Sequence, residues 1–402
     1  GDSVEFHGRP LRITIDPNTT KVNIYYNTTK DGVALQWLKP EQTADKKKPF
    51  VFSQGQSIWS RTWIPCQDSP GVRFTYNAKV SVPKDLMALM SAVNPQQKND
   101  TGVYTFKQNK AIPSYLMAIA VGDIEFKSID NRTGVYAEHS QIDKAKWEFA
   151  KLGDMVNAAE KLFGPYRWGR YDVIVLPPSF PFGGMENPNL TFLTPTVLAG
   201  DRSLTSLLAH ELGHSWSGNL VTNASWDETW LNEGFTVYFE NRIMEDVFGK
   251  DVANILAITE FQELEVALND IENGNHPEDS QLKLSLTGRN PDEGMTDIAY
   301  VKGAFFLRTI EKQVGRKKFD EFLKNYFDKH AFETITTEAF LSYIENELFK
   351  PNNITFNTKQ WIYEPGIPDN CIKITSERLN EMSLLADRIN NGESIFEGKN
   401  KN

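Results

Sequence analysis

The spacing of apolar residues changes at about residue 125, and this change constrains the fold more than any other feature of the chain. Four segments before it alternate between apolar and polar side chains, as half-buried strands do: 11–16, 21–26, 71–82 and 101–108. After it, residues 144–164 have apolar positions at helical spacing and end in Gly-Pro, a helix stop. One more strand pattern at 171–179 precedes helical patterns from about 203 to 350. The chain therefore combines a β region with a mainly helical one.

Turn-forming residues at 362–370 indicate a linker, and a further helical pattern begins at 375. We therefore expect an α+β multidomain fold. Its parts are an N-terminal antiparallel β domain at 1–125, a mainly helical domain at 126–362, and a linker with the start of a truncated C-terminal helical domain at 363–402. The abrupt opening on "GDSVEFHGRP" indicates that the first domain is incomplete at its start.

The charge and apolar content of the chain argue against a nucleic-acid partner and against a membrane span. The formal net charge is −10, and the one obvious basic run, Lys46 to Lys48, is typical of a solvated loop, so we expect no nucleic-acid partner. No apolar stretch approaches the roughly 20 residues of a membrane span, and no segment resembles a signal peptide. The two cysteines, Cys66 and Cys371, lack metal-type spacing and fit a reducing compartment, so we expect a cytoplasmic location. We also expect the protein to be a monomer.

The motif His210-Glu211-x-x-His214 lies inside an apolar run of helical character. Residues i and i+4 share one face of a helix, so the two imidazoles can reach one metal ion. Glu211 would lie close enough to contact a metal-bound water without being a ligand. An ordinary helix that carries these three side chains is an equally open interpretation of the five residues alone.

Glu233 follows the second histidine after eighteen residues, early in another helical pattern. A catalytic zinc ion uses three protein ligands and one open position, so His210, His214 and Glu233 form a suitable hydrolytic set. Zinc would lower the pKa of a bound water to about 7, and Glu211 would pass its proton to a leaving amine. Glu240 lies on the same helix face as Glu233, where it either supports a ligand histidine or is an exposed helix glutamate.

The stretch "FGGMEN" at 182–187 bears on which end of a substrate is cut. Its two glycines, Gly183 and Gly184, allow a substrate backbone to approach this strand closely, and Glu186 is placed to meet a cation. A peptide whose cation lies beside the scissile bond is one with a free α-amine. A plain tight turn is the alternative interpretation of the hexapeptide.

"GGMEN", then HELGH, then eighteen residues to "NEG", resembles the gluzincin aminopeptidases of the aminopeptidase N family. The match is closer to the leukotriene A(4) hydrolase branch, through segments between about residues 30 and 368 such as "ALQWLKPEQT", "PCQDSP", "LPPSFPFGGMENPNLTFLTPT", "SGNLVTN" and "QWIYEPGIP". The resemblance implies a saddle-like β domain, a thermolysin-like catalytic domain and a C-terminal helical domain. It also implies a zinc aminopeptidase that acts on short peptides with a free N-terminus.

The resemblance assigns a role to individual positions. It implies one zinc ion per chain on the two histidines and Glu233, and Glu211 as the general base. Tyr300 of "DIAYVKG" matches the tyrosine that stabilises the oxyanion; from its sequence neighbours alone it would be a core aromatic residue. Glu186 matches the glutamate that holds the substrate amine, and Gln56 of "QGQS" matches a second contact to that amine.

The same two motifs supply further expected substrate contacts: Gln54, Gly183, Gly184 and Met185. Two positions bear on the lipid-epoxide chemistry of the leukotriene branch. Met295 stands where that branch has a tyrosine near its epoxide site, which disfavours epoxide hydrolysis. Asp292 aligns with an aspartate of that branch linked to epoxide opening and to basic side chains. A residual epoxide hydrolase and a catalytically silent peptide-binding relative remain the alternatives.

Overall fold

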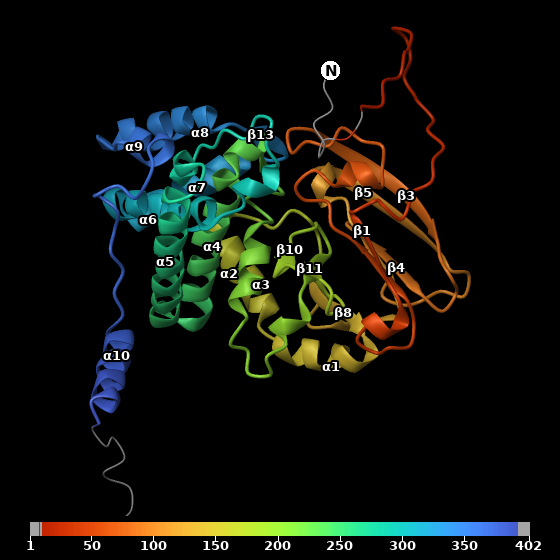
Figure 1. Ribbon diagram of the computed structural model, residues 1–402, viewed down its shortest axis with the longest axis horizontal. Helices are drawn as coiled ribbons and strands as arrows, with labels where there is room; N and C mark the ends of the chain where they lie inside the picture. Colours follow the sequence, from red (N-terminus) through yellow and green to blue (C-terminus); the bar gives the residue numbers. More distant parts are fainter. Residues whose placement is uncertain (1–7, 9, 393–402) are drawn as a thin grey trace, which may run out of the picture.

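The computed structural model describes residues 8 and 10–392 and places a β-rich part beside a helical part (Figure 1). Two antiparallel sheets make up the β-rich part. The larger sheet has the order β1 (Leu35–Leu38), β2 (Phe50–Ser53), β6 (Ile119–Gly122), β4 (Met87–Met90). The smaller sheet pairs β3 (Arg73–Ser81) with β5 (Val103–Pro113). The strand patterns at 71–82 and 101–108 are thus confirmed.

The prediction of strands at 11–16 and 21–26 was wrong, because the structure forms no strand there. Their apolar side chains, including Ile15 and Tyr25, are exposed. Alternation marks a segment that can bury one face, but a strand also needs a neighbouring backbone to bond with. Among the described residues, these two segments have no such neighbour.

A five-stranded mixed sheet stands between the β-rich part and the helices. Its order is β10 (Gly184–Met185), β11 (Thr191–Leu193), β9 (Tyr171–Val175), β8 (Thr133–Glu138), β7 (Ile124–Ser128). The three central strands, β11, β9 and β8, are parallel to one another, whereas the edge strands β10 and β7 pair antiparallel with β11 and β8. The sheet begins at Ile124, beside the expected boundary at residue 125, and within residues 8 and 10–392 no strand pairs with the outer edge of β10.

Both faces of this sheet are buried, in two different cores. Val135 and Val173 point into the core shared with the helices, whereas Tyr136, Ile174 and Phe192 join the core of the β-rich part. Successive side chains of a strand point to opposite faces, so one sheet serves both cores. The β-rich part and the helical part are therefore joined through a packed layer.

The core on the helical side of the sheet is enclosed by α1 (His139–Glu148), α2 (Leu152–Phe163), α3 (Ser206–Gly213), α4 (Trp230–Phe248), α5 (Lys250–Glu272), α6 (Gly303–Val314), α7 (Arg316–Lys329), α8 (Thr337–Ile344) and α9 (Thr358–Tyr363). A further helix, α10 (Glu377–Asn390), buries no residue in this core. A short parallel pair, β12 (Val221–Asn223) with β13 (Glu333–Ile335), joins the helices. The pattern at 144–164 is divided between α1 and α2, and α2 ends one residue before Gly164 as the helix stop predicts.

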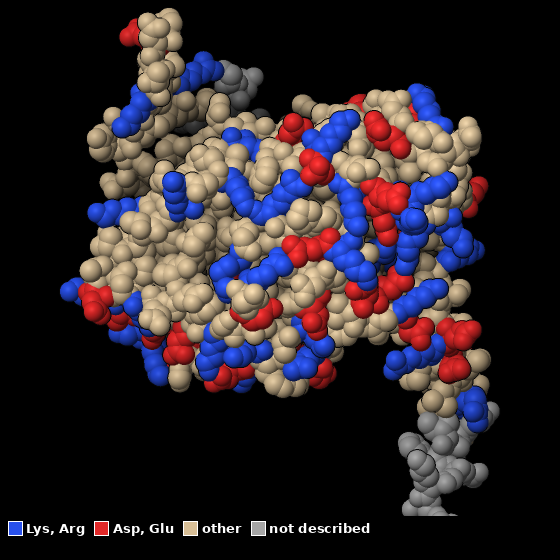
Figure 2. Space-filling view, turned by 180° about the vertical axis from the view of Figure 1, so that it is seen from behind, with Lys and Arg blue, Asp and Glu red and all other residues tan. Residues whose placement is uncertain are grey.

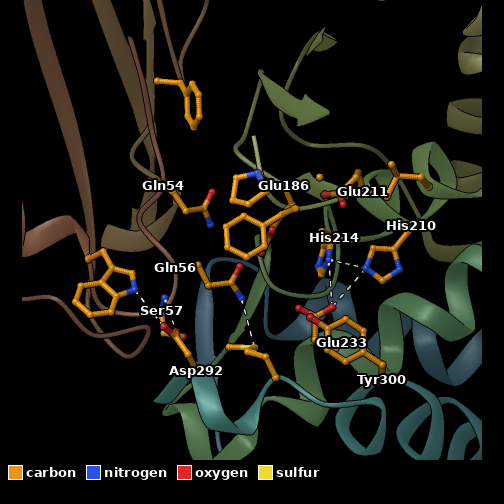
Figure 3. A pocket seen from close by; sticks show the side chains of 18 of the residues that line it. Gln54, Gln56, Ser57, Glu186, His210, Glu211, His214, Glu233, Asp292 and Tyr300 are labelled. Atoms are coloured by element: carbon orange, nitrogen blue, oxygen red, sulfur yellow. Dashed lines mark hydrogen bonds and ion pairs between the residues drawn. The ribbon is translucent and has the colours of Figure 1, made fainter. Parts of the chain in front are cut away.

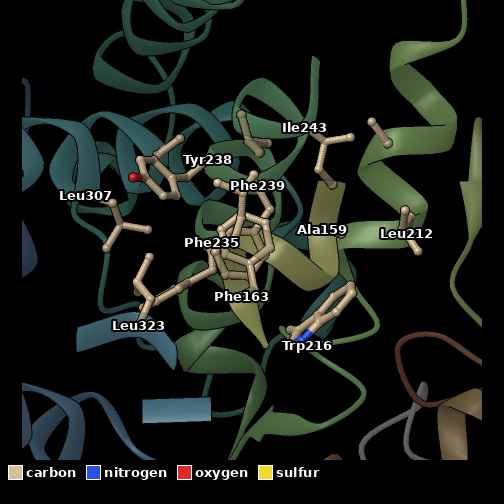
Figure 4. Close-up of a cluster of buried hydrophobic side chains, with 14 of the residues drawn as sticks. Ala159, Phe163, Leu212, Trp216, Phe235, Tyr238, Phe239, Ile243, Leu307 and Leu323 are labelled. Carbon is tan, nitrogen blue, oxygen red and sulfur yellow. The ribbon is translucent and has the colours of Figure 1, made fainter. Parts of the chain in front are cut away.

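Helix α4 lies at the centre of the helical core and is buried without interruption from Trp230 to Met244. Aromatic rings pack closely around it; Phe239 stacks on Phe163 of α2 with ring centroids 3.8 Å apart (Figure 4). A helix that is buried all round carries its polar side chains into the interior, where each needs a partner. Glu233 and Glu240 of α4 are such residues.

Helix α10 stands away from the body of the molecule (Figure 1), and its side chains Met382 and Leu384 are exposed. Within residues 8 and 10–392, no helix has the length and apolar character needed to cross a membrane. On the face shown in Figure 2, basic and acidic side chains are interspersed.

Candidate active site

A cavity of about 1060 Å³ opens where the β-rich part meets the helical part. Gln54 and Gln56 follow strand β2 on one side, while His210, Glu211 and Tyr300 come from the helical side (Figure 3). Glu186, which follows strand β10, lies between them (Figure 3). The structure thus brings the motifs that were singled out in the sequence into one cavity.

Three possible metal ligands converge in this cavity. His210 lies in the last turn of α3 and His214 caps that helix, while Glu233 lies in the first turn of α4. The two Nε2 atoms are 3.2 Å apart, and Glu233 Oε2 lies 3.5 Å from the first and 3.4 Å from the second. Ligand atoms of a tetrahedral zinc ion, each about 2.0–2.1 Å from the metal, are about 3.3 Å apart. The three donors therefore fit zinc.

The other ring nitrogen of each histidine is engaged by an acceptor. His210 Nδ1 lies 3.0 Å from Glu240 Oε2, so this glutamate is buried beside a candidate ligand and is not an exposed helix residue. His214 Nδ1 lies 2.9 Å from Asn232 Oδ1 and 3.1 Å from the Ser217 carbonyl. Acceptors at Nδ1 place the proton there and leave both Nε2 lone pairs for a metal.

Three buried carboxylate oxygens in the cavity have no hydrogen-bond partner: Glu186 Oε1, Glu211 Oε2 and Glu233 Oε2. Burying unpaired carboxylate oxygens is unfavourable, so their concentration in one cavity indicates that cations occupy it. A second group of possible metal donors, Glu186, Glu211 and His214, overlaps the first. Two imidazoles with oriented Nε2 atoms favour the set of His210, His214 and Glu233 as the zinc site.

The pKa values of the acidic groups follow from this crowding. Burial raises the pKa of the Glu211 carboxyl well above its usual range; the nearby His210 ring opposes this rise, and the neighbouring Glu186 and Glu233 add to it. Burial also raises the pKa of Glu186. Burial and the nearby Glu233 and Glu186 keep Tyr300 protonated, because they raise its pKa well above 10. Tyr300 is thus a hydrogen-bond donor at neutral pH.

Gly184 allows strand β10 to lie against Glu211. A Cβ atom added at Gly184 would be 2.3 Å from Glu211 Oε1 and 2.4 Å from its Cδ, far inside contact distance. Because no strand of the described residues pairs with the outer edge of β10, its backbone is available for an extended peptide to pair with, beside the candidate base. Gly183 and Met185 flank Gly184 on this strand segment, and Gly183 also lines the cavity.

Tyr300 reaches the metal ligands through a close helix crossing. It lies in a π-helical turn, η9 (Ile298–Lys302), directly before α6. A Cβ added at Gly234, the residue after Glu233, would be 2.8 Å from the Gly303 Cα atom at the start of α6. Two glycines therefore let α6 approach α4, and the Tyr300 ring stacks at 6.1 Å from the His210 ring. A π-turn of this kind is frequent at functional sites.

The side-chain amides of Gln54 and Gln56, from the β-rich part, contact methionine sulfur atoms in the cavity. Gln54 Nε2 lies 3.2 Å from Met185 Sδ, and Gln56 Nε2 lies 3.8 Å from Met295 Sδ. The Gln54 Oε1 atom has no partner. Both amides therefore keep hydrogen-bonding capacity toward a substrate.

Asp292 lines the cavity, but its carboxylate is already engaged. One oxygen accepts from the Ser57 N–H at 3.2 Å and from Ser57 Oγ at 2.6 Å, and the other accepts from Trp59 Nε1 at 3.2 Å (Figure 3). These partners come from the segment that carries Gln56. Asp292 thus ties that segment to the helical side of the cavity.

Sequence reasoning missed Asn232, whose side chain holds His214, and Asn219, whose side chain holds the Glu186 carbonyl at 2.8 Å. Asn232 directly precedes Glu233, and Asn219 lies in the "SGNLVTN" segment that contributed to the family resemblance. Position in a motif was thus a usable signal, but nothing in the chain order shows which atom each amide contacts.

Two family models match the chain. One described as the Peptidase family M1 domain covers residues 147–361, and one described as the Peptidase M1 N-terminal domain covers residues 8–116. Leukotriene A-4 hydrolase of Xenopus laevis is 43% identical over 383 residues, which are 92% of this chain and 62% of that protein. Leucine aminopeptidase 2 of Yarrowia lipolytica is 40% identical over 401 residues, 96% of this chain and 62% of that protein. The chain spans about 62% of the length of these curated relatives.

Solved structures agree with this result. Native leukotriene A4 hydrolase from Saccharomyces cerevisiae superposes with a TM-score of 0.84 at 37% identity, over 90% of this chain and 57% of that one. The M1 zinc metallopeptidase from Deinococcus radiodurans superposes with a TM-score of 0.65 at 24% identity, over 81% of this chain and 72% of that one, and supports the fold alone.

Proposed function

The chain belongs to peptidase family M1, and we propose that it is a zinc-dependent aminopeptidase that removes N-terminal residues from short peptides. One observation carries the proposal. A His-His-Glu donor set and the unpaired carboxylate oxygen of Glu186 face the same cavity. The donor set suits a hydrolytic metal, and the buried carboxylate suits an α-amine beside the scissile bond.

Glu186 and the β10 edge set the position of the substrate. The carboxylate of Glu186 pairs with the substrate ammonium, while the amides of Gln54 and Gln56 contact it from the β-rich part. The outer edge of β10 holds the extended peptide backbone. Because the amine stops at Glu186, only the first peptide bond lies beside Glu211 and the zinc ligands.

Glu211 acts as the general base. It takes a proton from the attacking water and then delivers that proton to the leaving amine. His210, His214 and Glu233 would hold a zinc ion, which supplies Lewis acidity and lowers the pKa of water when bound. Tyr300, kept protonated by its surroundings, donates a hydrogen bond to the oxygen that becomes negative in the tetrahedral intermediate.

Product analysis of short peptides tests this function. We expect an unblocked pentapeptide to lose residues one at a time from its N-terminus, and the same peptide with an acetylated N-terminus to remain intact, because Glu186 then has no cation to bind. Mass spectrometry of timed samples identifies the products. Internal cleavage of the acetylated peptide would show that the site is an endopeptidase instead.

A further inference from the structure

Asn219 joins two parts of the candidate site. It lies just after α3, with its side chain buried. Its backbone N–H donates to the His214 carbonyl at 3.0 Å, and its Nδ2 donates to the Glu186 carbonyl at 2.8 Å. One residue thus bonds the end of the metal-binding helix to the segment that carries the amine-binding glutamate.

Arg73, the first residue of β3, holds Asn219 from the β-rich part. Its Nη2 donates to the Asn219 carbonyl at 2.8 Å and to the Ala111 carbonyl at 2.6 Å, and its Nη1 donates to Thr222 Oγ1. All three acceptors are neutral, so these contacts do not neutralise the partly buried guanidinium. The planar fork of an arginine fixes the directions of several acceptors at once. Arg73 therefore orients the 219–222 segment.

We propose that Asn219 is a positioning residue that fixes Glu186 relative to His210, His214 and Glu233, and thereby sets the selectivity for a free α-amine. This inference rests on the proposed aminopeptidase function. Glu186 can stop a substrate at its first peptide bond only if its carboxylate stays at a constant distance from the zinc site. The Glu186 side chain has one buried oxygen, Oε1, with no hydrogen-bond partner to hold it. Its backbone is anchored instead, by the Asn219 amide.

The test measures binding, so that it does not depend on turnover. Asn219→Ala is made in zinc-loaded protein that also carries Glu211→Gln, which removes the general base. Leucinamide and 4-methylpentanamide, the same amide without the α-amine, are titrated by calorimetry. We expect Asn219→Ala to weaken the binding of leucinamide by about 10-fold, which is equivalent to 1.4 kcal/mol. The binding of 4-methylpentanamide should weaken by less than about 2-fold. If Asn219 had a purely structural role, its substitution would not change the ratio of the affinities for the two amides.

Asn223→Ala is the matched control, because Asn223 is equally buried, lies in the same segment and donates to a backbone carbonyl, that of Ser225 at 2.8 Å. It should leave the ratio of the two affinities unchanged. If Asn219→Ala leaves the ratio of the two affinities unchanged, whether or not both ligands bind more weakly, the inference is overturned. If that variant unfolds at the assay temperature, Asn219→Ser takes its place, since its hydroxyl is too short to replace the amide, and the same change in ratio is expected. Wild-type protein that hydrolyses no unblocked peptide would instead contradict the proposed function.

Discussion

Glu211→Gln is expected to lower kcat/KM for an aminoacyl anilide by at least about 100-fold, because it removes the general base and keeps the size of the side chain. The substituted amide cannot accept the proton of the attacking water. The metal ligands are untouched, so zinc content should stay at that of the wild type. Steady-state kinetics together with elemental analysis of the purified protein measure both quantities.

Glu148→Gln provides the control for this substitution. Glu148 is also a buried glutamate, but it accepts from the Gly200 and Arg202 N–H groups at 3.0 and 2.7 Å and does not line the cavity. We expect the activity of the Glu148→Gln variant to remain within a few fold of that of the wild type. Full activity of Glu211→Gln would assign the base elsewhere. A zinc-loaded wild type with no activity would favour a silent peptide-binding relative.

Glu186→Gln is expected to lower kcat/KM for unblocked substrates by about 30-fold or more. Removing one partner of a buried charge pair costs about 2 kcal/mol or more, and each 1.4 kcal/mol is a factor of ten. The loss should affect KM as well as kcat, because the amine contact exists in the ground state too. The measurement is the ratio of kcat/KM for leucine anilide to that for its N-acetyl derivative.

The ratio is what distinguishes amine recognition from a general loss of structure. Glu148→Gln again serves as the control and should preserve the wild-type ratio. If Glu186→Gln lowers both rates equally and keeps the ratio, Glu186 does not hold the amine. Another cavity group would then have to supply exopeptidase specificity.

Much of the site could be predicted because its chemistry follows from local spacing. The four-residue step from His210 to His214 fixes a common helix face whatever surrounds it, and Glu233 begins the next long helix. The strand patterns that found partners, such as 71–82, were equally readable. These predictions use only the geometry of single elements.

What the sequence left open depends on contacts between elements. The alternation at 11–16 does not say whether another strand lies beside it. The approach of α6 to α4 through Gly234 and Gly303 brings Tyr300 to the cavity, but no local pattern marks the two glycines as neighbours. The same holds for Asn219, whose amide contacts a residue 33 positions away.

Zinc titration of metal-free protein tests whether one bound zinc ion is required for peptide-bond hydrolysis. The protein is treated with a chelator, dialysed, and then given zinc in steps while bound metal and leucine anilide hydrolysis are measured together. We predict that the metal-free protein is inactive and that activity rises in proportion to bound zinc, up to one ion per chain. Full hydrolysis without metal, or one zinc ion bound at His210, His214 and Glu233 with no hydrolysis, would show that the protein is not a zinc-dependent aminopeptidase.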